Sequence, residues 1–311
     1  MQKPLEITES FDIDSIPNLD VVVLAALELL QTTALPALNI DAYKKPLVIG
    51  SGNALQTGKI LFSSTPARFA DESTYHEALA QYDDIDTVVV VSASGSKHAS
   101  GIAKTAKDSG KDVVLLTNNP AAPAAEFVAA EHIHVFPKNR EPYTYNTSTY
   151  LSMIFAETGE SPATILSYIM QSVEPQALRN FADYRSYVFI LPARFEAATA
   201  MVRTKFDELF GPYVQGRVFT DEEIKHAKTV VTSGDELFIA LGSENKHYGV
   251  GKNRICLELP AGAGYATVIA ASYYLVGLIQ KAHPPFFKDN IEAYTQTASE
   301  IFGHEIKPIV E

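Results

Sequence analysis

The sequence predicts an α/β protein with two domains, each built on a mainly parallel β-sheet. Apolar runs typical of buried strands alternate with helix-like segments, which is the pattern of βαβ units with right-handed crossovers. This pattern occurs in the first half and again in outline in the second, although the halves share little residue identity. The chain has 311 residues, 46% hydrophobic and 20% charged, so it is long enough for two cores.

The first domain is predicted over residues 18–175, after an extended, polar lead-in at 1–17. Asn18 is the expected N-cap of its first helix. The expected elements, in order, are helix 19–34, a strand with its glycine loop at 45–53, helix 54–63, short segments 67–70 and 75–82, strand 87–91, helix 102–109, strand 112–116, short helix 121–130, strand 132–136, and helices 150–157 and 162–172.

The second domain is predicted over residues 187–311, after a linker at 176–186. Its first strand is the apolar run 187–191, and Pro192 opens the helix that follows. The remaining expected elements are the rest of that helix, through Phe206, strands 236–241 and 255–259, and a helix of small residues at 261–280.

The strongest sign of a ligand site lies in residues 87–101. A strand-like run of valines breaks into Ser92-Ala-Ser94-Gly95-Ser96-Lys97-His98 just before a helix start. The first N–H groups of a helix have no intrahelical partner and its dipole adds partial positive charge, so an anion such as phosphate fits there. This loop and the glycine loop both follow strands, at the edge where parallel sheets bind ligands. A Ser/Gly-rich turn also caps helices for structural reasons, which is the alternative.

The overall charge restricts the partners. A formal net charge of −12 and a pI near 5.2 argue against a surface that binds nucleic acid, because such surfaces need clustered Lys and Arg. A single small anion in a local pocket remains compatible. The apolar stretches 19–30 and 264–279 are too short, or too interrupted by small polar residues, to span a bilayer, so no membrane partner is expected.

The single cysteine and the histidines suggest no redox or metal chemistry. Cys256 cannot form an intrachain disulfide, which favours a reducing, cytoplasmic setting. It lies in an apolar run, which predicts a buried structural thiol. His132 and His134 share one face of a strand, but no cysteine or carboxylate cluster completes a metal site beside them. Neither a metal nor a cofactor is expected.

The loop motifs resemble the sugar-isomerase (SIS) domain, a family that binds phosphosugars. The resemblance is carried by Ser92-Ala-Ser94-Gly95, by Gly50-Ser-Gly-Asn53 before it and by Thr147-Ser148-Thr149 after it. Lys97 stands where the family has a hydroxyl residue, and a lysine can still serve phosphate as a point charge. The phosphosugar-binding residues that the resemblance implies are Gly52, Asn53, Ser92, Ser94, Gly95, Ser96, Lys97, Thr147 and Ser148.

The second half is similar to the isomerase part of glucosamine-6-phosphate synthase, a member of that family. Lys205-Phe-Asp-Glu208 is similar to its Lys-x-x-Glu segment and Glu223-Ile-Lys-His226 to its Glu-Leu-Lys-His segment, and Lys307 lies in a similar C-terminal tail. The separation of Glu208 from His226 is slightly longer than in the family, and Ala227-Lys228 replaces its Gly-Pro. The resemblance implies two three-layer α/β/α domains and a homodimer whose sites lie near the interface.

The resemblance implies a metal-independent aldose–ketose isomerase acting on a hexose or hexosamine 6-phosphate. Glu208 would move the proton through an enediol, His226 would open the ring, and Lys205 or Lys307 would face the developing negative charge. Each residue also has an ordinary interpretation, because Glu208 and His226 both lie among charged residues typical of a solvated surface. The alternatives are a sugar-phosphate deglycase and a phosphosugar-binding regulatory protein without turnover.

Overall fold

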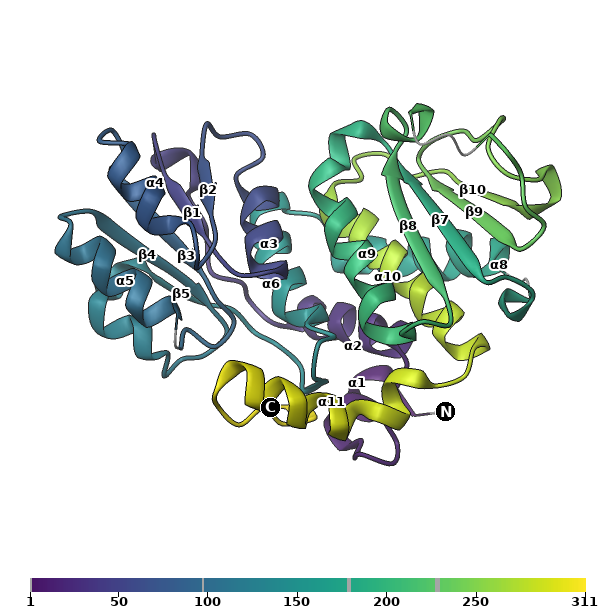
Figure 1. Ribbon diagram of the computed structural model, residues 1–311, viewed down its shortest axis with the longest axis horizontal. Helices are drawn as coiled ribbons and strands as arrows, with labels where there is room; N and C mark the ends of the chain where they lie inside the picture. The colour runs from purple at the N-terminus through teal and green to yellow at the C-terminus, as the bar shows by residue number, and fades with distance from the viewer. Residues whose placement is uncertain (1, 97, 178–179, 227–229) are drawn as a thin grey trace. The chain divides into compact units, whose positions relative to one another are not determined.

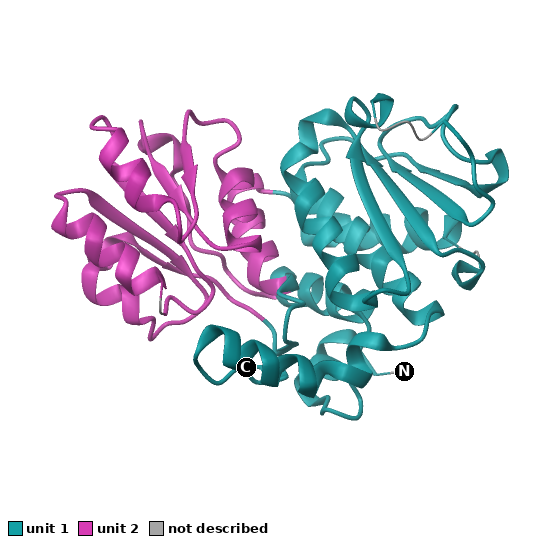
Figure 2. Ribbon diagram, viewed as in Figure 1, with its two compact units in different colours: residues 1–31, 139–147, 160–311 teal, residues 32–138, 148–159 magenta. Residues whose placement is uncertain are grey.

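The computed structural model describes residues 2–96, 98–177, 180–226 and 230–311. Its contacts divide the chain into two compact units, which are coloured separately in Figure 2. We call residues 32–138 with 148–159 the five-stranded unit, and residues 1–31, 139–147 and 160–311 the four-stranded unit.

The five-stranded unit is built on a wholly parallel sheet in the order β2-β1-β3-β4-β5. The central strand β3 is buried at every position, as expected of a valine-rich strand covered on both faces. The strands are β1 (Leu47–Ile49), β2 (Arg68–Ala70), β3 (Thr87–Val91), β4 (Asp112–Thr117) and β5 (Ile133–Val135). The helices are α3 (Asn53–Leu61), α4 (Tyr75–Gln81), α5 (His98–Asp108) and most of α6 (Thr147–Thr158).

Helices cover both faces of this sheet (Figure 1). On one face, Val88 and Leu115 of the sheet share a core with Ala103 of α5 and with α4. On the other, a Cβ at Gly58 of α3 would lie 2.6 Å from Cγ1 of Val48, so the absence of a side chain lets α3 approach β1 closely. The predicted parallel α/β sheet is confirmed for this unit.

The four-stranded unit contains a second parallel sheet, in the order β10-β9-β7-β8, and a short antiparallel pair, β6 with β11. Tyr187 and Phe189 of β7 pack against Phe206 of α9, and the other face of the sheet packs against Ile224 and Tyr248. The strands are β6 (Glu141–Pro142), β7 (Ser186–Leu191), β8 (Gln215–Thr220), β9 (Glu236–Leu241), β10 (Arg254–Leu257) and β11 (Ile309–Val310). The helices are α1 (Pro4–Ser10), α2 (Leu19–Thr32), α7 (Pro162–Tyr168), α8 (Glu174–Gln176), α9 (Glu196–Phe210), α10 (Tyr265–Ala282) and α11 (Phe286–Phe302).

Helix α2 packs against α10, far from it in sequence. A Cβ at Gly277 of α10 would lie 1.9 Å from the backbone nitrogen of Asp20, and Gln280 Oε1 accepts a hydrogen bond of 2.9 Å from the backbone N–H of Leu19. These contacts explain why residues 1–31 belong to the four-stranded unit. The bounds of the units therefore differ from the predicted division into residues 18–175 and 187–311.

The close approach at Gly277 predicts a loss of stability in the variant Gly277→Ala. The added methyl would meet backbone rather than a flexible side chain, so the helices must separate, and we expect a cost of about 2 kcal/mol in urea unfolding. Gly101→Ala is the matched control, because a Cβ there has no neighbour within 4 Å and alanine favours a helix. Equal stability of the two variants would contradict this account of the helix packing.

The structure corrects the prediction for the N-terminal segment. Residues 1–17 are not simply extended, because α1 forms with Pro4 at its first position and with the Glu6 carboxylate accepting a hydrogen bond of 3.1 Å from the backbone N–H of Lys3. The carboxylate of Glu28 in α2 accepts another, of 3.0 Å, from the N–H of Leu5. Two backbone N–H groups at the start of α1, those of Lys3 and Leu5, are thus each bound by a carboxylate.

Other differences concern the four-stranded unit. No element was predicted where β8 and α11 form. In the five-stranded unit, α5 begins four residues before the predicted helix start. The thiol of Cys256 is exposed, so the prediction of a buried cysteine is wrong. The reason is the two-residue period of β10, which turns Ile255 and Leu257 inward and Cys256 outward.

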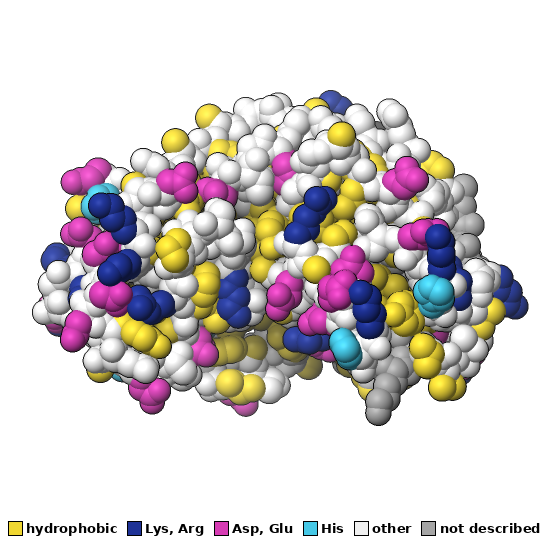
Figure 3. All heavy atoms as spheres, turned by 90° about the horizontal axis from the view of Figure 1, so that it is seen from above, with side chains coloured by type: hydrophobic (Ala, Val, Ile, Leu, Met, Phe, Trp, Pro, Cys, Tyr) yellow, Lys and Arg dark blue, Asp and Glu magenta, His cyan; other side chains and the backbone are white. Residues whose placement is uncertain are grey.

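The surface is of mixed charge. On the face drawn in Figure 3, Lys and Arg side chains lie among Asp and Glu side chains rather than in one basic stripe. Within the part of the chain that the structure describes, no helix is both long and apolar enough to cross a membrane.

Candidate functional site

The serine loop, residues 92–96, connects β3 to the N-terminus of α5. The Ser92 hydroxyl accepts a hydrogen bond of 3.2 Å from the backbone N–H of Gly95, and the hydroxyls of Ser94 and Ser96 lie 2.8 Å apart. Asn119 at the end of β4 donates its side-chain amide to the Ser94 carbonyl at 2.9 Å. The loop is therefore a folded turn, held from the neighbouring strand, with Ser94 exposed and Ser92 and Ser96 partly exposed.

Gly95 determines the shape of this loop. Its φ is +60°, and a Cβ there would lie 2.4 Å from Cβ of Ala122. Its carbonyl accepts a hydrogen bond of 2.9 Å from the N–H of Ala124, in the turn that covers α5. Only glycine fits both the left-handed backbone and the close approach.

We expect Gly95→Ala to weaken the binding of fructose 6-phosphate, a representative sugar phosphate, by about tenfold or more, because the left-handed backbone and the clash displace the loop. Titration calorimetry measures the change. Gly110→Ala is the control, since Gly110 has a φ of +71° but no atom within 4 Å of an added Cβ. Unchanged affinity in Gly95→Ala would remove the loop from the binding site.

The glycine loop lies next to the serine loop. Strands β1 and β3 are paired, with Ile49 opposite Val90, so the loops that follow them are neighbours at the carboxyl edge of the sheet. Gly52 has a φ of +53°, and Asn53 begins α3. Ser51 donates a hydrogen bond of 2.5 Å to Glu72, which follows β2 at the same edge and was not singled out from the sequence.

The predicted contacts Thr147 and Ser148 are buried, with 1% and 0% of their surfaces exposed. The backbone N–H of Thr147 donates a hydrogen bond of 2.6 Å to the carboxylate of Glu141, which is itself buried and caps the start of α6. Glu141 thus acts as a buried helix cap. Lys97, also predicted to bind phosphate, lies outside the described residues.

The four-stranded unit brings two of the predicted catalytic residues together. The Lys205 ammonium donates a hydrogen bond of 2.7 Å to Glu208, one helical turn further along α9. The Lys205 side chain is fully buried, and 17% of the Glu208 side chain is exposed. Burial raises the pKa of the Glu208 carboxyl, and the charge of Lys205 opposes that shift.

Two tyrosines with no recognisable sequence motif lie near this carboxyl. The rings of Tyr143 and Tyr294 have centroids 5.9 Å apart, and burial together with the charge of Glu208 raises the pKa of Tyr294. The C-terminal tail is held here too, because the Tyr143 N–H donates a hydrogen bond of 2.8 Å to the carbonyl of Pro308. Lys307, exposed, precedes that proline. Tyr143 and the tail meet through the pairing of β6 with β11, which no local motif reveals.

His226 lies near the end of strand β8 opposite to Glu208. Glu208 is in the last turn of α9, which leads to the amino end of β8, whereas His226 follows the carboxyl end of that strand. The six residues of β8 span about 17 Å, so Glu208 and His226 lie near opposite ends of this strand. His226 is exposed, and Ala227 and Lys228 after it lie outside the described residues.

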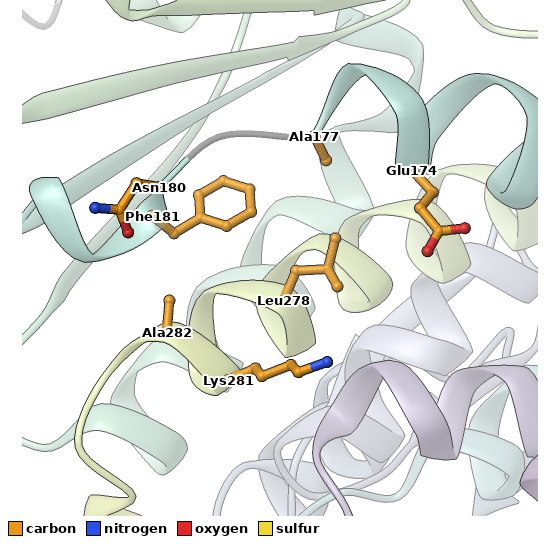
Figure 4. A pocket seen from close by; sticks show the side chains of 7 residues that line it. All are labelled: Glu174, Ala177, Asn180, Phe181, Leu278, Lys281 and Ala282. Carbon is orange, nitrogen blue, oxygen red and sulfur yellow. The ribbon is translucent and has the colours of Figure 1, made fainter.

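The structure also has an open pocket of about 520 Å³ in the four-stranded unit (Figure 4). Lys281 and Glu174 give it one charge of each sign, and Phe181 and Leu278 give it apolar wall. None of the predicted site residues lines it.

Known proteins resemble this chain in structure and not detectably in sequence. Neither protein-family models nor curated protein sequences match this chain. Solved structures do match. Tagatose-6-phosphate ketose/aldose isomerase from Escherichia coli has a TM-score of 0.59 at 13% identity, covering 92% of each chain.

Two further structures match over nearly the whole chain. Glucosamine-6-phosphate deaminase from Thermotoga maritima has a TM-score of 0.53 at 13% identity, covering 90% of this chain and 94% of its own. The C-terminal domain of glucosamine-fructose-6-phosphate aminotransferase from Francisella tularensis has a TM-score of 0.52 at 13% identity, covering 93% and 96%. The chain therefore has the fold of the phosphosugar isomerases, and the resemblance to that family is confirmed at the level of the fold.

Proposed function

We propose that this protein is an aldose–ketose isomerase acting on a hexose or hexosamine 6-phosphate. The observation that carries the proposal is the serine loop, folded between a buried parallel strand and the N-terminus of α5 on a fold shared with phosphosugar isomerases. Hydroxyls and the helix N-terminus suit a phosphate, and Gly95 keeps the loop free of a side chain there.

The phosphosugar site in this proposal consists of the serine and glycine loops and the start of α6. Ser92, Ser94, Ser96 and Lys97 bind the phosphate, and the mutual hydrogen bond of Ser94 and Ser96 is exchanged for bonds to phosphate oxygens. Gly52 and Asn53 face the sugar. Because Thr147 and Ser148 are buried, they would act mainly by fixing the N-terminus of α6.

Glu208 is the proposed base. It removes the proton at C2 of the open-chain aldose and returns it at C1 of the enediol, while the proton of the O2 hydroxyl passes to O1, so the carbonyl moves from C1 to C2. A carboxylate with an ordinary pKa is a weak base at neutral pH, and burial raises the pKa of Glu208 towards the range where it can both accept and release a proton. Lys307 would face the charge that develops on the enediolate.

The active form in this proposal is a homodimer in which His226 opens the ring of a substrate bound to the other copy. Its place at the edge opposite Glu208 supports a role in trans. Val230 and Val231, with 66% and 82% of their surfaces exposed, follow His226 closely in the chain and suit a protein contact.

Mixing inactive Glu208→Gln and His226→Ala proteins should restore activity if subunits exchange and the histidine acts in trans. If each variant is inactive and the mixture, after subunit exchange, remains inactive, the role in trans is wrong.

The direct test incubates the protein with hexose and hexosamine 6-phosphates in deuterated water and follows C2 exchange by NMR. Isomerisation with deuterium at C2 supports the proposal. Release of an amine from a glycated sugar phosphate would instead establish the deglycase alternative. Tight binding without exchange would establish a binding protein, and no thermal stabilisation by any sugar phosphate would rule out the phosphate site.

A further inference from the structure

The Lys205 ammonium is held by three neighbours within the four-stranded unit. It donates hydrogen bonds of 2.6 Å to the carbonyl of Thr144 and 2.7 Å to the carboxylate of Glu208, and it lies 5.4 Å from the centroid of the Tyr273 ring. Two of its three N–H donors are used by these hydrogen bonds, and the ring of Tyr273 lies beside the ammonium. The side chain is 0% exposed, so Lys205 has no open path to a substrate.

The carbonyl that Lys205 holds belongs to a strained turn. Thr144 and Asn146 have φ values of +76° and +45°, which are costly for residues other than glycine and most of all for a β-branched threonine. The Thr144 hydroxyl is buried and has no hydrogen-bond partner among the described residues. Such a backbone persists only where its surroundings fix it.

The turn leads directly into α6. Thr147 follows Asn146, and its N–H is bound by Glu141. On the far side of the turn, the Tyr145 hydroxyl donates a hydrogen bond of 3.0 Å to the carbonyl of Pro17. Tyr145 thus ties the turn to Pro17, just before α2, and Lys205 ties the Thr144 carbonyl to Glu208.

We propose that Lys205 is a positioning residue, whose ammonium locks the left-handed turn at Thr144 to the carboxylate of Glu208 and so fixes the start of α6 relative to the proposed base. This role replaces that of a cation facing the substrate. It rests on the proposed function only in giving Glu208 the part of the base. The coupling of turn and carboxylate can be measured without any substrate.

The experiment measures hydrogen–deuterium exchange of the amides of residues 143–147 and the melting temperature in three variants. They are Lys205→Met, the double variant Lys205→Met/Glu208→Leu, and the control Lys225→Met. Lys225 forms the same one-turn pair, with Glu222 at 2.6 Å, but on the surface. The double variant removes the buried charges together, which often preserves stability, so it remains folded even if the single variant does not.

If Lys205 positions the turn, the amides of residues 143–147 exchange about tenfold faster in the single variant, because the Thr144 carbonyl loses a charged donor. They stay fast in the double variant although its melting temperature recovers, and Lys225→Met leaves them unchanged. Slow exchange in the double variant, or in a folded Lys205→Met protein, would overturn the proposal. Absence of sugar-phosphate turnover would instead count against the proposed function alone.

Discussion

The variant Glu208→Gln is expected to lower the rate of C2 proton exchange by about a hundredfold or more, the range of general base catalysis. Glutamine keeps the size of the side chain and can still accept a hydrogen bond from Lys205, but it cannot take the proton. The affinity for sugar phosphate should change little, because the serine loop contributes to binding and not to proton transfer. NMR in deuterated water gives the exchange rate, and calorimetry gives the affinity.

Asp207→Asn is the matched control for this prediction. Asp207 is the adjacent residue of α9 and is exposed, so its amide variant removes a carboxylate of the same helical turn without touching the buried one. The control should retain most of the exchange rate. Comparable losses in both variants, or full exchange in Glu208→Gln, would take the role of base away from Glu208.

Replacing Lys205 by methionine is expected to lower the free energy of unfolding by about 3 kcal/mol, because removing one partner of a buried ion pair leaves the other charge uncompensated. Lys225→Met, the exposed counterpart, should leave stability almost unchanged. Urea unfolding of the variants and the wild type measures both. A loss in Lys205→Met no larger than in the control would show that the buried pair contributes nothing net.

The cost of Lys205→Met should grow with pH. The pKa of Glu208 is already raised by burial, and the Lys205 charge that opposes this shift is lost in the variant. A carboxyl with a raised pKa in the folded state gives a stability that is present below its unfolded pKa, 4.5, and is lost as the pH rises through the folded value. The variant should therefore approach the wild type in acid and fall behind it towards neutral pH. The opposite trend would contradict the direction of the shift.

Much of the five-stranded unit could be predicted from its sequence because its signals are local. Four consecutive valines between Thr87 and Ser92 identify β3, and the Ser/Gly run that follows identifies the loop. The parallel order then places the glycine loop beside it. Edge strands are harder, since β8 reads Gln-Gly-Arg-Val-Phe-Thr, where one face is half-exposed and no continuous apolar run marks it.

The surroundings of Glu208 could not be predicted, because they depend on distant segments. The strained turn at Thr144, the tail strand β11 and Tyr294 of α11 come from three parts of the sequence. The family resemblance assigned Glu208 and His226 to one reaction, whereas the order of α9 and β8 puts them near opposite ends of β8. The number of residues between two motifs does not show at which ends of the intervening strand they lie.

The path of the chain has a consequence for dissecting the protein. It crosses between the two units at residues 31–32, 138–139, 147–148 and 159–160, and the third crossing falls within the first turn of α6. A cut in the segment 176–186 would leave α2 on one fragment and its partner α10 on the other. We expect neither fragment to be a self-sufficient folding module, whereas the two co-expressed pieces should reassemble. Chimaeras that join the two halves of related proteins at residues 176–186 should therefore fail to fold, whereas chimaeras that exchange surface loops should fold.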